Sequence, residues 1–116
     1  MQARIAAMET EADQALSWHP VCGANDLETG GVLHVETGGL ELALFRLDDG
    51  YHATSDICTH MRSRLSDGYV KNGTVQCPLH FGRFDIRTGQ ALSAPCKKGV
   101  RTFATKVDAG RVWVGM

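Results

Sequence analysis

Two short stretches decide this fold: Cys58-Thr59-His60 and Cys77-Pro78-Leu79-His80, with sixteen residues between His60 and Cys77. Each stretch offers one thiolate and one imidazole to a metal. Two cysteines and two histidines can hold a [2Fe–2S] cluster in which histidines replace two cysteines on one iron. The same four side chains can also hold a single zinc ion. The choice between these two metal centres decides most of what the sequence implies about function.

The spacing of the four side chains favours the cluster. Zinc sites usually take both cysteines from one C-x-x-C turn and both histidines from one H-x3–5-H segment. Here each stretch mixes a cysteine with a histidine. If one iron binds the thiolates and the other binds the imidazoles, each loop contacts both irons. Pro78 and Gly82 suit such loops, because the backbone must stay rigid and approach the cluster closely. A single zinc and a chance grouping are the alternatives.

The sequence resembles the Rieske-type ferredoxins of bacterial aromatic-ring-hydroxylating dioxygenase systems. The resemblance is tight over residues 56–95 and loose over about residues 18–114. It rests on both metal-binding stretches, together with Phe84-Asp85 and Thr88-Gly89. The resemblance implies one Rieske [2Fe–2S] cluster with four ligands, which are Cys58, His60, Cys77 and His80.

The same resemblance implies an electron carrier rather than an enzyme. It implies a protein that takes electrons from an NAD(P)H-dependent flavoprotein reductase and passes them singly to a terminal oxygenase. It further implies that Cys58 and Cys77 bind the buried iron, whereas His60 and His80 bind the outer iron. A Rieske small subunit of another redox enzyme, such as a nitrite reductase, is one alternative. A zinc-stapled interaction module is the other.

The residues after the second histidine bear on the reduction potential. High-potential Rieske proteins have a serine and a tyrosine there that donate hydroxyl hydrogen bonds to the cluster, where this chain has Gly82 and Phe84. They also join their ligand loops by a disulfide that this sequence does not provide. Fewer donors leave the sulfurs more electron-rich. We expect a potential near the low end of the Rieske range, about −150 mV.

Length and composition limit the number of domains and the cellular location that the sequence allows. A chain of 116 residues has room for one domain. We expect residues 17–116 to form the Rieske domain, with a cluster-binding subdomain at about 56–97. Residues 1–16 form an N-terminal extension, in which Ile5, Met8, Ala12 and Leu16 have the spacing of a short helix. No apolar run is long enough for a membrane span, and no secretory signal is present, so we expect a cytoplasmic protein.

Charge is unevenly divided along the chain. Residues 1–50 hold nine acidic and two basic side chains, whereas residues 51–116 hold four acidic and ten basic ones. The basic side chains either mix with acidic ones on the folded surface or form a positive rim that steers partner proteins. No basic stripe with interleaved aromatic residues indicates nucleic-acid binding. We expect a monomer.

The remaining sequence predicts an all-β fold, an antiparallel β sandwich or open barrel, from short β-prone runs separated by turns. Asn72-Gly73 between two such runs predicts a tight hairpin. The expected strands are residues 18–21, 32–36, 40–47, 51–54, 69–71, 74–76, 84–86, 90–92, 100–107 and 111–114. His19, His34 and His52 are expected to be structural, and Cys22 is expected to be a buried core thiol. Cys96 is either a spare thiol or a small apolar residue.

Overall fold

A computed structural model of the chain describes residues 16–57, 63–79, 82–93 and 98–116. This part of the chain is all-β, as predicted, and its only helical element is a short 3-10 turn, η1 (Leu65–Asp67). The strands are β1 (Trp18–Gly23), β2 (Val32–Thr37), β3 (Leu40–Leu47), β4 (Gly50–Ser55), β5 (Tyr69–Lys71), β6 (Thr74–Gln76), β7 (Arg83–Asp85), β8 (Thr102–Asp108) and β9 (Arg111–Gly115). No helix in these ranges is long and apolar enough to cross a membrane.

Six strands form the larger sheet, in the order β1-β9-β8-β4-β3-β2. Each neighbouring pair is antiparallel. The two edge strands, β1 and β2, also contact each other, so the sheet curls into a nearly closed barrel. This arrangement agrees with the predicted open barrel, and closure protects both edges from pairing with other chains.

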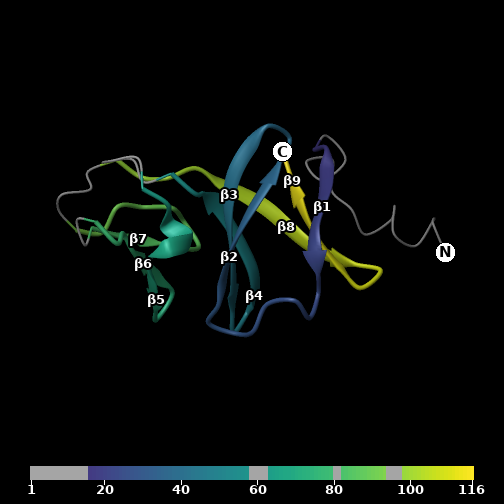
Figure 1. Cartoon of the computed structure of the whole chain (residues 1–116), viewed down its shortest axis with the longest axis horizontal. Coiled ribbons are helices and arrows are strands. Elements are labelled where there is room, and N and C mark those ends of the chain that lie inside the picture. The colour runs from purple at the N-terminus through teal and green to yellow at the C-terminus, as the bar shows by residue number, and fades with distance from the viewer. Residues whose placement is uncertain (1–15, 58–62, 80–81, 94–97) are drawn as a thin grey trace.

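Three short strands form a second sheet in the order β5-β6-β7. It is inserted between β4 and β8 and lies beside the barrel along the long axis of the molecule (Figure 1). This small sheet is the base of the predicted cluster-binding subdomain. It has only three residues in each strand, so its backbone pairing alone is a weak source of stability.

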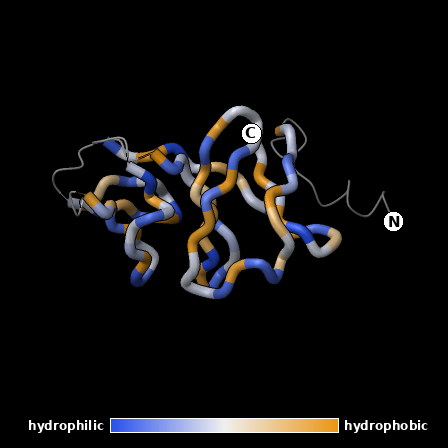
Figure 2. The backbone as a smooth tube through the Cα atoms, viewed as in Figure 1, coloured by the Kyte–Doolittle hydropathy of each residue, from blue (hydrophilic) through white to orange (hydrophobic). Residues whose placement is uncertain are grey.

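Strand β3 of the larger sheet is buried on both faces, because its outer face packs toward the small sheet. Leu42 and Leu44 point into the barrel core, whereas Ala43, Phe45 and Leu47 point toward the small sheet. Successive side chains of a strand point to opposite faces, which explains why LELALFRL is a nearly continuous apolar run. The short strands β5, β6 and β7 instead place one hydrophobic residue between two hydrophilic ones, and Figure 2 shows the mixed colouring of the small sheet.

The β5–β6 hairpin closes through the predicted turn. Asn72 and Gly73 have φ angles of 52° and 76°, as a two-residue type I′ turn requires. The β8–β9 hairpin has the same backbone pattern, but Ala109 (φ 53°) takes the place of the asparagine before Gly110 (φ 75°). An alanine in the left-handed region is the less favourable choice.

The structure corrects two details of the sequence prediction. Residues 90–92 do not form a strand, because only a single bridge, Phe84–Ala91, continues the pairing beyond β7. Cys22 is half-buried at the edge of the barrel core rather than fully buried within it. The predicted helix over residues 1–16 lies almost wholly outside the described residues.

Candidate metal centre

Of the four predicted ligands, Cys77 lies in the described part of the chain. Cys58, His60 and His80 lie outside it, as does Cys96. The structure nevertheless describes the residues on both sides of each segment that carries predicted ligands. These flanking residues form the base of each segment. The site can therefore be built from these bases.

Both ligand segments are closed where they leave the small sheet and the barrel. The backbones of Ile57 and Arg64 form an isolated antiparallel bridge, which brings together the two ends of the first segment. The N–H of Cys77 donates a 2.8 Å hydrogen bond to the carbonyl oxygen of Gly82, which closes the second segment. Each of these closing contacts spans a different one of the two predicted metal-binding stretches.

Cys77 follows directly after β6 and is fully buried. It packs in a hydrophobic core with Leu65, Val75, Phe84 and other side chains between the small sheet and β3. A buried thiol in such a core would usually be inert. A metal, in contrast, requires the thiolate, and the surrounding apolar side chains would exclude water from it.

A serine that the sequence analysis did not single out contacts this sulfur. Ser63 Oγ lies 3.0 Å from Cys77 Sγ. Ser63 comes just before Arg64, at the end of the first ligand segment, and Cys77 begins the second. The contact therefore joins the two loops. No local sequence pattern indicates it, because the residues are 14 positions apart.

The carboxylate of Asp56 organises the base of the first loop. Asp56 is fully buried, two residues before Cys58. Its Oδ1 accepts a 2.7 Å hydrogen bond from the backbone N–H of Ser66, and its Oδ2 accepts a 2.6 Å bond from the Ser66 hydroxyl. Its backbone oxygen accepts a 2.7 Å bond from the N–H of Leu65. These bonds fix η1, which follows the loop, against the strand end that precedes it.

His34 links this buried carboxylate to β2. Its Nδ1 lies 2.5 Å from Asp56 Oδ2, and its Nε2 lies 3.1 Å from Glu36 Oε2. The hydrogen bonds to Asp56 and to Glu36 raise the pKa of His34 above its ordinary value. His34 is thus structural, as predicted, but it has the specific task of completing the hydrogen bonds of Asp56. The sequence analysis missed the Asp56–His34 pair, since its members are 22 residues apart.

A glycine lets the chain pass closely behind Cys77. A Cβ atom on Gly68 would lie 2.1 Å from the backbone oxygen of Gln76, the residue before Cys77. Backbone atoms cannot move away as a flexible side chain could. Gly68 therefore allows η1 to pack against the end of β6, and so brings the base of the first loop against the second.

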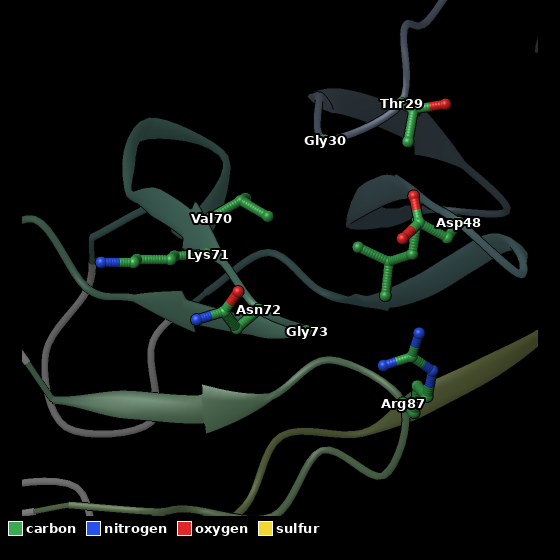
Figure 3. A pocket seen from close by; sticks show the side chains of 9 residues that line it. Thr29, Gly30, Asp48, Val70, Lys71, Asn72, Gly73 and Arg87 are labelled. Carbon is green, nitrogen blue, oxygen red and sulfur yellow. The ribbon is translucent and has the colours of Figure 1, made fainter.

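A cavity of about 260 Å³ lies at a different place, between the β5–β6 turn and the β3–β4 turn (Figure 3). Asp48 and Arg87 point into this space, with Asn72 and Gly73 on the opposite wall. Arg87 also pairs with Asp49 at 2.9 Å. The hydrogen bond from Arg87, followed by that of His52, holds the pKa of Asp49 well below its ordinary value. The cavity is a polar junction between the sheets and contains no predicted ligand.

The basic side chains fit neither a fully mixed surface nor a continuous positive rim. Arg64 and Arg87 of the basic half pair with Glu41 and Asp49 of the acidic half. These two basic residues are therefore partly neutralised within the fold. Arg83 lies on the exposed side of β7. A uniformly positive rim is accordingly too simple a description of this surface.

The residues present fit a [2Fe–2S] cluster. The donor set combines two thiols and two imidazoles, divided between two loops that are each closed at the base. Cys77, the one predicted ligand that the structure describes, is buried where a thiolate would be shielded from water. Its sulfur also has a hydroxyl within hydrogen-bond distance, as the sulfurs of iron–sulfur centres commonly do.

Comparison with known proteins gives an independent result. The family model for the Rieske [2Fe-2S] domain matches residues 17–104. The ferredoxin component of the naphthalene 1,2-dioxygenase system of Pseudomonas putida is 39% identical over 101 residues, which cover 87% of this chain and 97% of the relative.

Solved structures agree with the sequence match. One is the complex of reduced oxygenase and oxidised ferredoxin in carbazole 1,9a-dioxygenase. Its matching chain has a TM-score of 0.80 and 36% identity, covering 84% of this chain and 92% of that one. A Mycobacterium tuberculosis protein assigned as the small subunit of an NADH-dependent nitrite reductase has a TM-score of 0.79 and 28% identity. That match covers 87% of this chain and 96% of the other.

Proposed function

Because the chain belongs to the Rieske [2Fe-2S] domain family, we propose that it carries single electrons to the terminal oxygenase of an aromatic-ring-hydroxylating dioxygenase system. The supporting observation is the 39% identity to a ferredoxin component over nearly the full length of both chains. The electrons come from an NAD(P)H-dependent flavoprotein reductase. The chain acts as a monomer in the cytoplasm, as a component separate from both partners.

The family implies one Rieske-type cluster, which when bound supplies reversible one-electron transfer. We assign Cys58 and Cys77 as the thiolate ligands of one iron, and His60 and His80 as the imidazole ligands of the other. The burial of Cys77 supports its assignment to the inner iron. The protein's task is to hold these four side chains, exclude water from the thiolates and leave the imidazoles near a partner.

The exposure of the residue before His80 supports the proposal that the electron leaves the protein near His80. Leu79, the residue before His80, is 55% exposed although it is a large hydrophobic residue. An exposed apolar side chain next to an electron-exit ligand can be covered by a partner at small desolvation cost. We therefore place the oxygenase contact at the tip of the second ligand loop.

The chain carries electrons but does not hydroxylate a substrate by itself. Oxygen activation of that kind uses a separate iron held by two histidines and a carboxylate. The described histidines lie on three different strands, β1, β2 and β4. His34 is hydrogen-bonded to Asp56, and His52 is hydrogen-bonded to Asp49. The relative from the naphthalene 1,2-dioxygenase system is likewise a ferredoxin component.

A second candidate is the small subunit of a nitrite reductase. The favouring observation is the TM-score of 0.79 to the protein assigned to that role. The fold alone does not separate the two functions, but the sequence identity is higher for the dioxygenase ferredoxins. Co-purification with a large, inseparable partner would favour this candidate.

Reconstitution tests the proposal. The chain is mixed with NADH, a flavoprotein reductase and a naphthalene-type terminal oxygenase, and product is measured with and without the chain. We expect product formation only when the chain is present, and loss of it in His80→Ala. Cys22→Ala, a cysteine outside the ligand loops, serves as the control and should remain active. A reduced chain that the oxygenase fails to reoxidise would contradict the proposal.

A further inference from the structure

The contact between the two ligand loops carries a further inference. Ser63 Oγ and Cys77 Sγ are 3.0 Å apart, within the reach of a hydrogen bond to sulfur. Either atom could donate if Cys77 were a thiol. A cluster ligand is a thiolate and has no proton. If Cys77 is a ligand, as the proposed function has it, the Ser63 hydroxyl must therefore be the donor.

We propose that Ser63 is a tuning residue that donates a hydrogen bond to the ligand sulfur of Cys77 and raises the reduction potential of the cluster. A hydroxyl that donates to an anionic acceptor forms a charge-assisted bond. The added electron increases the negative charge on the sulfur, so the bond strengthens on reduction. Hydrogen bonds to the sulfurs are among the features that set the potentials of iron–sulfur clusters.

The fold holds Ser63 on its C-terminal side. Arg64, the next residue, bridges to Ile57. Leu65 donates its N–H to the backbone oxygen of Asp56, and the Leu65 side chain is fully buried in the same core as Cys77. The serine therefore directly precedes a backbone that is already ordered, and fixing its hydroxyl costs little additional entropy.

The buried carboxylate of Asp56 holds η1, and with it Ser63, through bonds that do not involve the two cluster loops. It is bonded to Ser66 on one side and to His34 of β2 on the other. The barrel thus sets the position of η1, and η1 sets the position of Ser63. Asp56 positions η1 through the backbone N–H of Ser66, a bond that does not need the Ser66 hydroxyl, whereas Ser63 itself contacts the sulfur of Cys77.

This bond changes what the sequence implies about the potential. Gly82 and Phe84 provide no hydroxyl after the second histidine, and this indicates a potential at the low end of the Rieske range. Ser63 provides a hydroxyl from the opposite loop. The chain should therefore lie above the potential that the same fold would have without this donor.

Ser63→Ala tests the inference in the cluster-loaded protein. Only the difference in the strength of this hydrogen bond between the two oxidation states affects the potential. We expect the equilibrium constant for reduction to fall about tenfold, equivalent to about 59 mV for one electron. Ser63→Thr keeps the hydroxyl and should restore most of the shift. Protein-film voltammetry measures all three proteins.

Resonance Raman spectroscopy gives a readout that a purely structural role would not change. Exchange into D2O should shift an iron–thiolate stretching band in the original protein and in Ser63→Thr, and this shift should disappear in Ser63→Ala. Ser66→Ala is the matched control, because its hydroxyl bonds Asp56 rather than sulfur. It should release the cluster faster but keep both the isotope shift and the potential.

The outcomes separate this inference from the proposed function. A protein without iron and sulfide would overturn both. A loaded protein whose potential and isotope shift are the same with serine or alanine at position 63 would overturn the inference alone. If Ser63→Ala does not retain the cluster, the original protein still decides: an iron–thiolate band that is unchanged in D2O contradicts the bond.

Discussion

The two hydrophobic cores that meet at β3 depend on different sources of stability. The barrel core is formed by apolar side chains from long, paired strands, including Leu42 and Leu44. The second core lies over strands of three residues and includes Cys77, the proposed metal ligand. We therefore expect the barrel to stay folded on burial alone, and the small sheet to need the crosslink between its loops. Metal binding and folding should be coupled in the second core only.

Removal of the cluster should have the largest effect on the difference in stability between the two cores. Cys77→Ala should abolish the visible absorbance of the cluster. Amide hydrogen exchange should then show free energies of opening near zero in β5–β7, while β3 and β9 stay protected. Cys22→Ala, beside the barrel core, should keep the cluster and all protection. Equal loss of protection in both sheets would contradict the independence of the barrel.

Cavities in the two cores should also have different consequences. Phe84→Ala removes a fully buried ring from the core around Cys77 and should cost about 3–5 kcal/mol, with rapid cluster loss at 25 °C. Leu44→Ala on the barrel side should cost about 2–5 kcal/mol and lower the apparent Tm, with an unchanged visible spectrum at 25 °C. Absorbance and far-UV circular dichroism measure both effects. Cluster loss at the same rate in the two variants would contradict separate cores.

The link between the cores should depend on pH through His34. Its pKa is raised in the folded state, chiefly by Asp56, so the stabilisation is fully present below the ordinary value of about 6.5. It is lost as the pH rises through the raised pKa. The apparent Tm of the original protein should exceed that of His34→Gln most at pH 5.5, by the equivalent of about 1 kcal/mol. A difference that grows toward pH 9 would show the opposite sign and contradict this assignment.

The smallest effects concern the two hairpin turns, one in each sheet. Asn72→Ala places a side chain that disfavours positive φ in the β5–β6 turn and should destabilise the small sheet by up to about 1 kcal/mol. Ala109→Asn makes the reverse change in the β8–β9 turn and should stabilise the barrel by a similar amount. Hydrogen exchange in each hairpin measures the two effects. Changes of the same sign would mean that turn conformation does not decide them.

Local patterns in the sequence predicted much of this architecture. The bounds of β3, β5 and β6 agree with the prediction because each has a strong local signal. For β3 the signal is a nearly continuous apolar run, and for β5 and β6 it is an Asn-Gly turn between β-prone residues. The strand expected at residues 90–92 was wrong, because one bridge to Phe84 is all the pairing that remains there. Strand propensity does not report how many partners the fold supplies.

The metal centre likewise has a part that the sequence predicts and a part that it does not. Family comparison confirms the Rieske cluster that the two short stretches predicted. The support around Cys77 could not be predicted, because Ser63 and the Asp56–His34 pair come together only when distant segments pack. Serine and aspartate in a loop have many local roles, such as turns and caps. Only the tertiary structure shows that Ser63 faces Cys77 and that His34 faces Asp56.

Elemental analysis of anaerobically purified protein, combined with electron paramagnetic resonance after dithionite reduction, tests the central claim most directly. The account predicts two irons and two acid-labile sulfides per chain, with a reduced-state signal of a mixed cysteine and histidine cluster. A single zinc per chain with no signal after reduction would contradict it.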